Sequence, residues 1–290
     1  MASTIILKRR IKSIRNTRQI TKAMELVSAS KLRKASVHSL KSSEYYNLSL
    51  ELLHTLSNIT EVERLEMFAA RNVKTKLYIV ITSNSGLAGS YNSNTIKILT
   101  KNLSEDQAKH ISTKVITIGN KAAQFVKRLS GHELIATYPA FSNEPNANDI
   151  RPILNTIISG YKEKEFDEVS LIFTEFISTI KQNAKVVDLL PIKKDQFESN
   201  GKVTAAYNFE PSIESVIEEI ATRLIEAQLY HGVVESITSE HAMRMVAMKN
   251  ATDNAKDLIE DYTLELNTAR QAVITQELAE ISGGVEALNA

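Results

Sequence analysis

The chain has 290 residues, 24% of them charged and 43% hydrophobic, a composition typical of a folded protein with room for one long or two ordinary domains. It contains no cysteine, which excludes a disulfide framework, a thiolate metal site and a cysteine nucleophile. No apolar run approaches a membrane span, and residues 5–7 do not resemble a signal-peptide core because the basic residues follow them. We therefore expect no cleaved leader. The net charge of +1 conceals an uneven distribution of charge.

The first predicted element is a long, basic helix over residues 1–58. Neither proline nor glycine occurs before Gly86, and apolar residues recur every three or four positions, which is the spacing of one helical face. The first 34 residues carry ten lysines and arginines but only one acid, Glu25. Such a run is also typical of nucleic-acid binding, but no aromatic residues are interleaved with it.

The middle of the chain, residues 73–192, changes period and predicts an α/β domain. Residues 76–82 and 115–118 form apolar, β-branched runs that are typical of buried parallel strands. Three predicted helices cover residues 94–103, 122–129 and 149–161. Two further strands, 168–177 and 185–190, favour an antiparallel hairpin that turns near Gln182. The domain is therefore expected to be Rossmann-like, with a mixed sheet.

The last segment, residues 211–290, predicts a second very long helix. Between Pro211 and the pair Gly283-Gly284 the only helix breaker is Gly232, so we expect the helix to start at Pro211 and to stop at the glycine pair. At about 1.5 Å per residue, some seventy residues would run roughly 100 Å. This segment carries fourteen acids and five basic residues. Its charge is opposite to that of the N-terminal helix, which predicts that the two helices pair as an antiparallel coiled coil. Exposed ion pairs would orient this pairing more than strengthen it, at roughly 0–1 kcal/mol each.

No catalytic or metal-binding constellation emerges from the residues. The loop of residues 82–92 lies between a strand and a helix, where nucleotides bind in doubly wound sheets, but it matches neither phosphate-binding fingerprint, and a tight turn explains its glycines as well. The six histidines do not pair at ligand spacing. Met243, Met245 and Met248 cluster in the C-terminal segment, which suits either a surface that meets changing partners or ordinary coiled-coil packing.

Three long motifs resemble the gamma subunit of F-type ATP synthases. The opening helix of that family is similar to residues 10–33, RIKSIRNTRQITKAMELVSASKLR. Its C-terminal signature is similar to residues 239–255, SEHAMRMVAMKNATDNA, and to residues 267–281, NTARQAVITQELAEI. The resemblance covers both ends of the chain and the order of the segments between them.

The resemblance implies a rotor shaft without catalytic residues, cofactor or metal of its own. In the family, the two terminal helices form the shaft inside a ring of three alpha and three beta subunits, and the catalytic residues lie on beta. The central domain sits against the epsilon subunit and the membrane c-ring. Proton flow turns the shaft, which drives each catalytic site through open and closed states. The expected location is the cytoplasmic face of a bacterial membrane, as a peripheral subunit; the mitochondrial inner membrane, matrix side, is the alternative.

The same resemblance implies five residues that contact the beta subunit. Met24 and Arg244 match positions that face the moving lower part of beta. Arg270, Gln271 and Thr275 match positions on the upper shaft that hydrogen-bond to catch loops of beta. For each of these residues, a solvated position on a helix is the alternative.

One loop departs from the family pattern, which usually reads Ser-Asp-Arg-Gly-Leu-Cys-Gly. Here residues 83–89 read Ser-Asn-Ser-Gly-Leu-Ala-Gly, so Asn84 and Ser85 replace the acidic and basic pair and Ala88 replaces the cysteine. An ion-pair role of the loop is thereby in doubt, whereas its turn glycines remain. The absence of cysteine also excludes the dithiol control of plastid members.

Two other functions remain open from the residues themselves. One is a nucleotide-binding α/β enzyme with helical arms for dimerisation, supported only by the loop around Gly86 and Gly89. The other is a passive coiled-coil scaffold that holds other proteins together.

Overall fold

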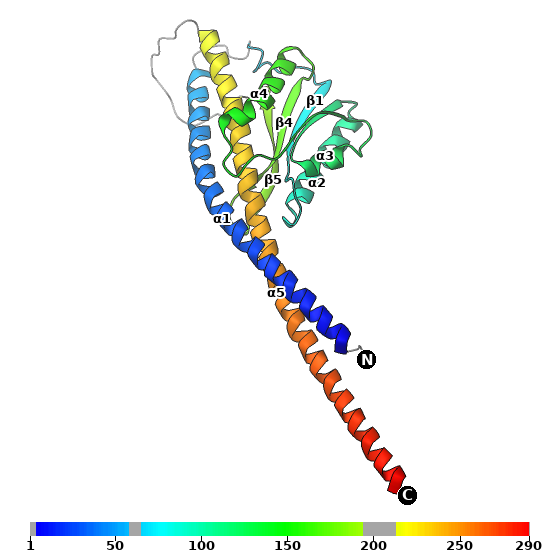
Figure 1. Ribbon diagram of the computed structural model, residues 1–290. Coiled ribbons are helices and arrows are strands. Elements are labelled where there is room, and N and C mark those ends of the chain that lie inside the picture. Colours follow the sequence, from blue (N-terminus) through cyan, green and yellow to red (C-terminus); the bar gives the residue numbers. More distant parts are fainter. Residues whose placement is uncertain (1–3, 58–64, 194–212, 290) are drawn as a thin grey trace. The chain divides into compact units, whose positions relative to one another are not determined.

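The described part of the chain contains two long helices, a five-stranded sheet and three shorter helices (Figure 1). The structure, a computed structural model, describes residues 4–57, 65–193 and 213–289. Helix α1 covers Thr4–Ser57, and helix α5 covers Ile213–Asn289, a length of 77 residues. The chain divides into two compact units, residues 1–28 with 245–290 and residues 29–244. Both long helices contribute to both units; the division at residues 58, 73, 192 and 211 stays a prediction.

The larger unit, residues 29–244, contains a mixed sheet with the strand order β3-β2-β1-β4-β5. Its strands are β1 Thr75–Ile81, β2 Ser112–Ile118, β3 Glu133–Tyr138, β4 Glu168–Phe176 and β5 Gln182–Leu190. Strands β1 to β4 are parallel to their neighbours, and β5 runs antiparallel to β4. The predicted fold class, an α/β domain with a mixed sheet between two long helices, is confirmed. Strand β3 was not predicted, because most of its residues are only half-buried.

The alternation of side chains along the strands sends two apolar sets to opposite faces of the sheet. Tyr78 and Val80 of β1 pack with helices α2 (Tyr91–Ala108) and α3 (Asn120–Val126). Leu77 and Ile79, one position away, pack with α4 (Ala147–Lys162) and with the long helices. Strands β1, β2 and β4 are therefore buried on both faces, which explains their nearly continuous apolar sequences.

In this unit, α5 is covered almost all round. Every residue from 232 to 239 is buried, including Glu235, Ser236 and Thr238. Gly232 does not interrupt the helix; a β-carbon at this position would lie 2.6 Å from Cδ2 of Leu171 on β4. The glycine thus permits a close approach of α5 to the sheet. A helix buried on all sides cannot show the one-sided apolar pattern of a surface helix.

In the smaller unit, the two helices pair antiparallel. Buried or half-buried positions of α5 recur in alternating steps of four and three: 248, 252, 255, 259, 262, 266 and 269. On α1 the corresponding positions include Leu7, Ile11 and Thr21. Thr252 donates a hydrogen bond of 2.8 Å to Thr21, while Arg10 lies 5.8 Å from the ring centre of Tyr262. These spacings are those of a heptad seam, and Met248 packs within it.

Two details of the long helices differ from the sequence analysis. The glycine pair Gly283-Gly284 does not end α5, which continues to Asn289. A glycine costs a helix about 1 kcal/mol relative to alanine, which disfavours the helix without forbidding it. The expected start at Pro211 lies outside the described residues.

In addition, no ion pair within 4.0 Å joins the basic residues 8–34 to α5 in the described part of the chain, so direct charge pairing does not hold the helices together.

Two glycines with positive φ provide a matched test of the packing at the sheet edge. Gly119 and Gly131 have φ values of 95° and 87°. A β-carbon at Gly119 would lie 2.0 Å from the carbonyl oxygen of Thr82, whereas at Gly131 it would meet nothing within 4 Å. We expect Gly131→Ala to lower the free energy of unfolding by about 1–2 kcal/mol through backbone strain alone. Gly119→Ala should cost roughly 3–5 kcal/mol because it adds a steric clash. Urea unfolding midpoints measure both; equal losses would contradict this assignment.

Candidate functional site

The first polar cluster of the larger unit joins α5 to the end of β4. Strand β1 pairs with β4 only as far as Ile172, so the backbone of β4 beyond this residue lacks a neighbouring strand on that side. Side chains of α5 take its place. The Ser236 hydroxyl accepts a hydrogen bond of 3.1 Å from the Thr174 N–H, and the Ser239 hydroxyl donates one of 3.1 Å to the Thr174 carbonyl oxygen. Oε2 of Glu235 accepts a bond of 2.7 Å from the Phe176 N–H.

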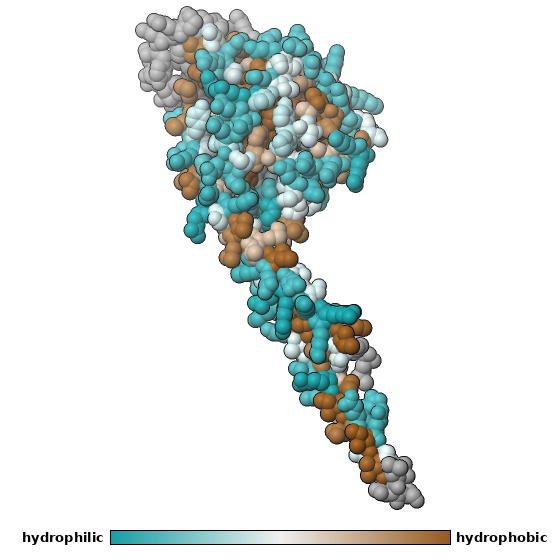
Figure 2. All heavy atoms as spheres, in the orientation of Figure 1, coloured by the Kyte–Doolittle hydropathy of each residue, from teal (hydrophilic) through white to brown (hydrophobic). Residues whose placement is uncertain are grey.

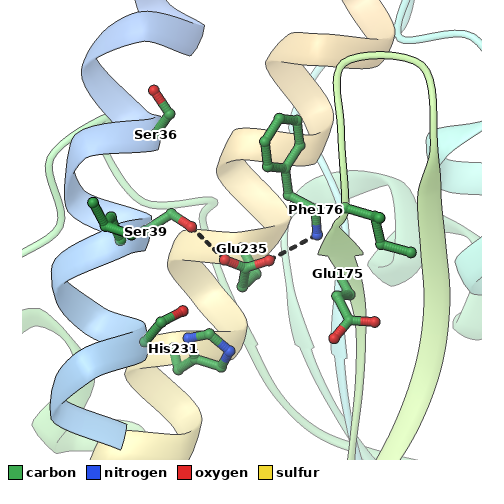
Figure 3. Close-up of a pocket in the computed structure, with 9 residues that line it drawn as sticks. Ser36, Ser39, Glu175, Phe176, His231 and Glu235 are labelled. Carbon is green, nitrogen blue, oxygen red and sulfur yellow. Dashed lines mark hydrogen bonds between the residues drawn. The ribbon is translucent and has the colours of Figure 1, made fainter. Parts of the chain in front are cut away.

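We call this cluster the β4 joint; it consists of Glu235, Ser236 and Ser239 on α5 and of Thr174 and Phe176 on β4. Glu235 also links the joint to the other long helix, α1. Its second carboxylate oxygen accepts a short hydrogen bond from the Ser39 hydroxyl of α1 (Figure 3). Glu235 is 4% exposed; its bond with Ser39 is buried and its bond with Phe176 is partly buried. Charge-assisted hydrogen bonds of this kind are stronger than neutral ones. One buried carboxylate therefore links α1, α5 and β4.

His231 lies one helical turn before Glu235 on α5, and both residues line the same hollow (Figure 3). Its ring stacks on Tyr46 of α1 at 5.1 Å between ring centres and meets the Phe173 ring edge-on. Burial lowers the pKa of His231; the negative charge of Glu235 opposes this shift, and the positive charge of Lys185 adds to it. A hollow of about 430 Å³ lies beside these residues and is lined by serine hydroxyls and by two carboxylates.

The stability of the β4 joint tests this arrangement. Glu235→Ala would leave the half-buried Phe176 N–H without its acceptor, at a cost of about 1–3 kcal/mol, and would also remove the link to α1. We expect the melting temperature of the chain to fall by roughly 5–10 °C. Glu235→Gln retains an acceptor and should cost much less. Glu219→Ala, at an α5 residue whose side chain is 75% exposed, is the matched control and should change little. A fall of equal size in the control would contradict a specific role of Glu235.

The second polar cluster surrounds Arg244. Its guanidinium forms an ion pair of 2.7 Å with Glu240, one turn earlier on α5, and the two side chains are only 10% and 14% exposed. Burial raises the pKa of Glu240, although the charges of Arg244 and Lys31 act in the opposite direction. The same guanidinium lies 3.4 Å from the Ser85 hydroxyl and 3.4 Å from the Gly86 carbonyl oxygen. Arg244 thus joins α5 to the loop that follows β1.

His241, next to Glu240, is buried and neutral. Its Nε2 lies 2.7 Å from Oδ1 of Asn143, and a neutral ring with its proton on Nε2 would donate this bond. Burial lowers its pKa to about 4, and the positive charges of Arg244 and Lys31 add to this shift. The lowered pKa has a consequence for stability. Below pH 6.5 the unfolded chain binds a proton that the folded chain rejects, so stability falls from pH 6.5 to about pH 4 and then levels off.

His241→Gln isolates this effect, because glutamine can donate to Asn143 but does not titrate. The loss attributable to His241 across this pH window is on the order of 3 kcal/mol. We expect the variant to lose less stability than the parent between pH 6.5 and 4, with the remaining slope including the contribution of His231. Denaturant titrations at several pH values measure this, and His110→Gln, at an exposed loop residue, is the control. An unchanged slope in His241→Gln would show that His241 does not titrate as described.

The five residues implied by the family resemblance fall in both units. Arg244 belongs to the larger unit and is buried in the cluster described above. Met24, on α1 of the smaller unit, is half-buried. Arg270 and Gln271 are exposed on α5, and their side chains form no hydrogen bond with the described residues. The Thr275 hydroxyl donates a bond of 2.9 Å to the Gln271 carbonyl oxygen. Arg270, Gln271 and Thr275 thus share one stretch of helix.

Polar side chains at both ends of the loop after β1 form hydrogen bonds with other parts of the same chain. Asn92 accepts the Ser83 N–H at 3.0 Å, and Thr82 accepts the Ala122 N–H at 3.0 Å. The Asn84 side chain accepts the N–H groups of Asn120 and Ala140. Of these four N–H donors, only that of Ser83 belongs to the loop itself, so the bonds tie the loop to α2, to the start of α3 and to the segment after β3. Within residues 4–57, 65–193 and 213–289, no group of three metal-ligating side chains occurs, and no helix is long and apolar enough to cross a membrane.

Comparison with known proteins decides the family. A family model described as ATP synthase matches residues 3–288. The chain is 40% identical to the ATP synthase gamma chain of Alkaliphilus metalliredigens over 286 residues, which covers 97% of each chain, and 39% identical to that of Herpetosiphon aurantiacus over the full length of both. The chain belongs to the ATP synthase gamma chain family. The family predicted from the three motifs is thereby confirmed. Members of this family are non-catalytic subunits that form the central stalk of the rotor.

Solved structures agree on the fold. A chain in the cryo-EM structure of OSCP, F1 and c-ring of the Euglena gracilis mitochondrial ATP synthase matches with a TM-score of 0.68 and 18% identity, over 98% of this chain and 94% of that one. A chain in the central stalk and c-ring structure of the Tetrahymena thermophila mitochondrial ATP synthase gives a TM-score of 0.62 and 22% identity, over 80% and 99%.

Sequence reasoning did not find the functional roles of Glu235, Ser236 and Ser239. Their spacing of one and four residues places them on one side of α5, but polar residues at helical spacing also occur on solvated faces. Their burial is decided by β4, some 60 residues earlier in the sequence.

Proposed function

We propose that this chain is the turning shaft of an ATP synthase and couples ion-driven rotation of a membrane ring to conformational change in the catalytic subunits. The observation that carries the proposal is α5, whose C-terminal part exposes large apolar side chains: Val273, Ile274, Leu278, Ile281 and Val285 are 45–64% exposed. Hydrophobic residues are visible along this part of α5 (Figure 2). A helix with this much apolar surface fits an enclosing partner.

The expected partners are three alpha and three beta subunits around the shaft, an epsilon subunit and the c-ring. The surface of α1 in the smaller unit supports contacts with acidic partners. Its basic residues are exposed and not paired with α5: Lys8, Lys12, Arg15, Arg18 and Lys22. We place the chain at the cytoplasmic face of a bacterial membrane, where it is attached through the assembled complex.

The shaft works by differential contact. A partner shifts a conformational equilibrium only by the difference in its affinity for the two states. Each rotary position of the shaft therefore has to bind one conformation of a catalytic subunit better than the others. We assign Arg270, Gln271 and Thr275 to the catch loops of beta, and Met24 and Arg244 to the moving lower part of beta. A guanidinium suits this task because its planar fork can engage a carboxylate with two bonds and then release it.

The upper contact is tested in the assembled enzyme with Arg270→Ala and Gln271→Ala. Loss of one charge-assisted hydrogen bond, worth about 1.5 kcal/mol, corresponds to roughly a tenfold lower rate of ATP synthesis. Gln276→Ala is the matched control, because Gln276 is an exposed glutamine of the same helix that bonds to Glu280 of its own chain. Synthesis by membrane vesicles measures the effect. Full activity of both variants would contradict the proposed contacts and favour a passive scaffold.

A further inference from the structure

A polar hollow lies at the surface of the larger unit, where α1, the end of β4 and α5 meet (Figure 3). Its volume is about 430 Å³, at the low end of the roughly 300–1,000 Å³ that is typical of small-molecule pockets. The hollow therefore has room for one long side chain or for a molecule of similar size. We call it the Glu175 hollow, after the β4 carboxylate that lines it.

The charge of the Glu175 hollow favours a cation. Its described lining residues include two carboxylates, Glu175 and Glu235, and no lysine or arginine. The third titratable group is His231, whose pKa is lowered by burial, so its ring is neutral near neutral pH and does not oppose a positive charge. An anion, in contrast, would meet two like charges.

One carboxylate oxygen of Glu175 is left for a partner. Oε1 of Glu175 accepts a hydrogen bond of 2.6 Å from Lys185 of β5, whereas Oε2 accepts none from the described residues. The side chain is 32% exposed, so a second cation can reach it. Ser43 of α1 lines the same hollow and is half-buried. Its hydroxyl also forms no hydrogen bond with the described part of the chain.

Exposed apolar side chains border the hollow. Leu40 and Ile177 line it and are 66% and 50% exposed. Val37, one turn before Leu40 on α1, is 54% exposed, and Ile180, in the turn between β4 and β5, is 89% exposed. Large apolar side chains gathered at a surface mark a contact with another protein rather than a site for a free ion.

We propose that the Glu175 hollow is a docking site for one arginine or lysine side chain of a neighbouring subunit, whose apolar residues cover Leu40 and Ile177. The inference rests on the proposed function only in that the partner is a subunit of the assembled enzyme. A long basic side chain suits both parts of the site. Its methylene stem can lie along apolar surface while its charged end reaches the carboxylate.

The absence of cysteine allows a direct test of whether the site is covered. In Leu40→Cys the introduced thiol is the only one on the chain. We expect a maleimide to label it roughly tenfold more slowly in the assembled enzyme than in the free full-length chain, as for a surface uncovered about a tenth of the time. Lys101→Cys, at an α2 residue whose side chain is 76% exposed, is the control and should slow much less. Equal rates for Leu40→Cys in both forms would overturn the proposal.

Two variants in the Leu40→Cys background separate the charge of Glu175 from its ion pair with Lys185. Glu175→Gln removes the charge, so labelling in the assembled enzyme should become roughly tenfold faster, the size of one charge-assisted hydrogen bond lost from an interface. Lys185→Met removes the same ion pair but keeps the negative charge, so labelling should stay slow. Equal acceleration by both variants would show that the ion pair only shapes the surface, and would overturn the docking site.

Photo-cross-linking from the thiol of Leu40→Cys in the assembled enzyme identifies the partner without altering Glu175. The cross-linked peptide should come from another subunit and contain an arginine or lysine within one helical turn of the cross-linked residue. Exchanging the charges, with Glu175→Arg here and glutamate in place of that basic residue, should restore most of the protection from labelling that either change alone removes.

A cross-linked peptide without a basic residue, a cross-link only to a second copy of this chain, or no restoration by the exchanged charges would each contradict the proposal. Co-purification of all subunits shows that a variant has folded and assembled. The proposed shaft function is judged separately by Arg270→Ala and Gln271→Ala. A negative result at Leu40 with a positive result at Arg270 would reject only the docking site.

Discussion

The larger unit depends on a single buried carboxylate that joins three elements. Glu235 receives the N–H of Phe176 at the end of β4 and the hydroxyl of Ser39 on α1. Removing a carboxylate from water is costly unless its oxygens are hydrogen-bonded, and here both are. The geometry of the bonds fixes the rotation of α5 about its own axis, because a turn of one residue would move Ser236 and Ser239 away from Thr174 as well. Hydrophobic burial alone, which has no direction, would not select this rotation.

The same joint explains why β4 can extend beyond its parallel neighbour. Strand β1 stops pairing at Ile172, yet β4 continues to Phe176 and pairs with β5 on its other side. Unpaired backbone groups buried away from water would cost about 1–3 kcal/mol each. Here these backbone groups of β4 are hydrogen-bonded by side chains of α5, namely Ser236, Ser239 and Glu235. A helix therefore takes the place of a neighbouring strand. For a shaft this is a useful connection, because a force on the sheet is passed to α5 through bonds as well as through packing.

The sequence could predict the elements whose signal is local, and it failed where the deciding partner is remote. The apolar runs of β1, β2 and β4, the absence of helix breakers in α1 and their scarcity in α5 were sufficient for the fold class. Strand β3 was missed because its residues are only half-buried. The opposite charges of α1 and α5 suggested ion pairs, but the basic side chains of residues 8–22 face solvent and the heptad seam is apolar or small. The burial of Glu235 depends on Ser39, which is 196 residues away, and no local pattern contains that information.

Charged residues therefore have different roles in the two parts of α5. In the smaller unit the helices pair through a seam of small and apolar residues, which leaves the positive charge of α1 available to other chains. In the larger unit the ion pair between Arg244 and Glu240 is largely buried, and Arg244 also contacts the backbone of the loop after β1. A buried ion pair contributes little net stability, because desolvation offsets its attraction, and is better at selecting one arrangement over its alternatives. The contacts of Arg244 with the Ser85 hydroxyl and the Gly86 carbonyl oxygen are such a selection, because they hold the loop against α5 in one arrangement.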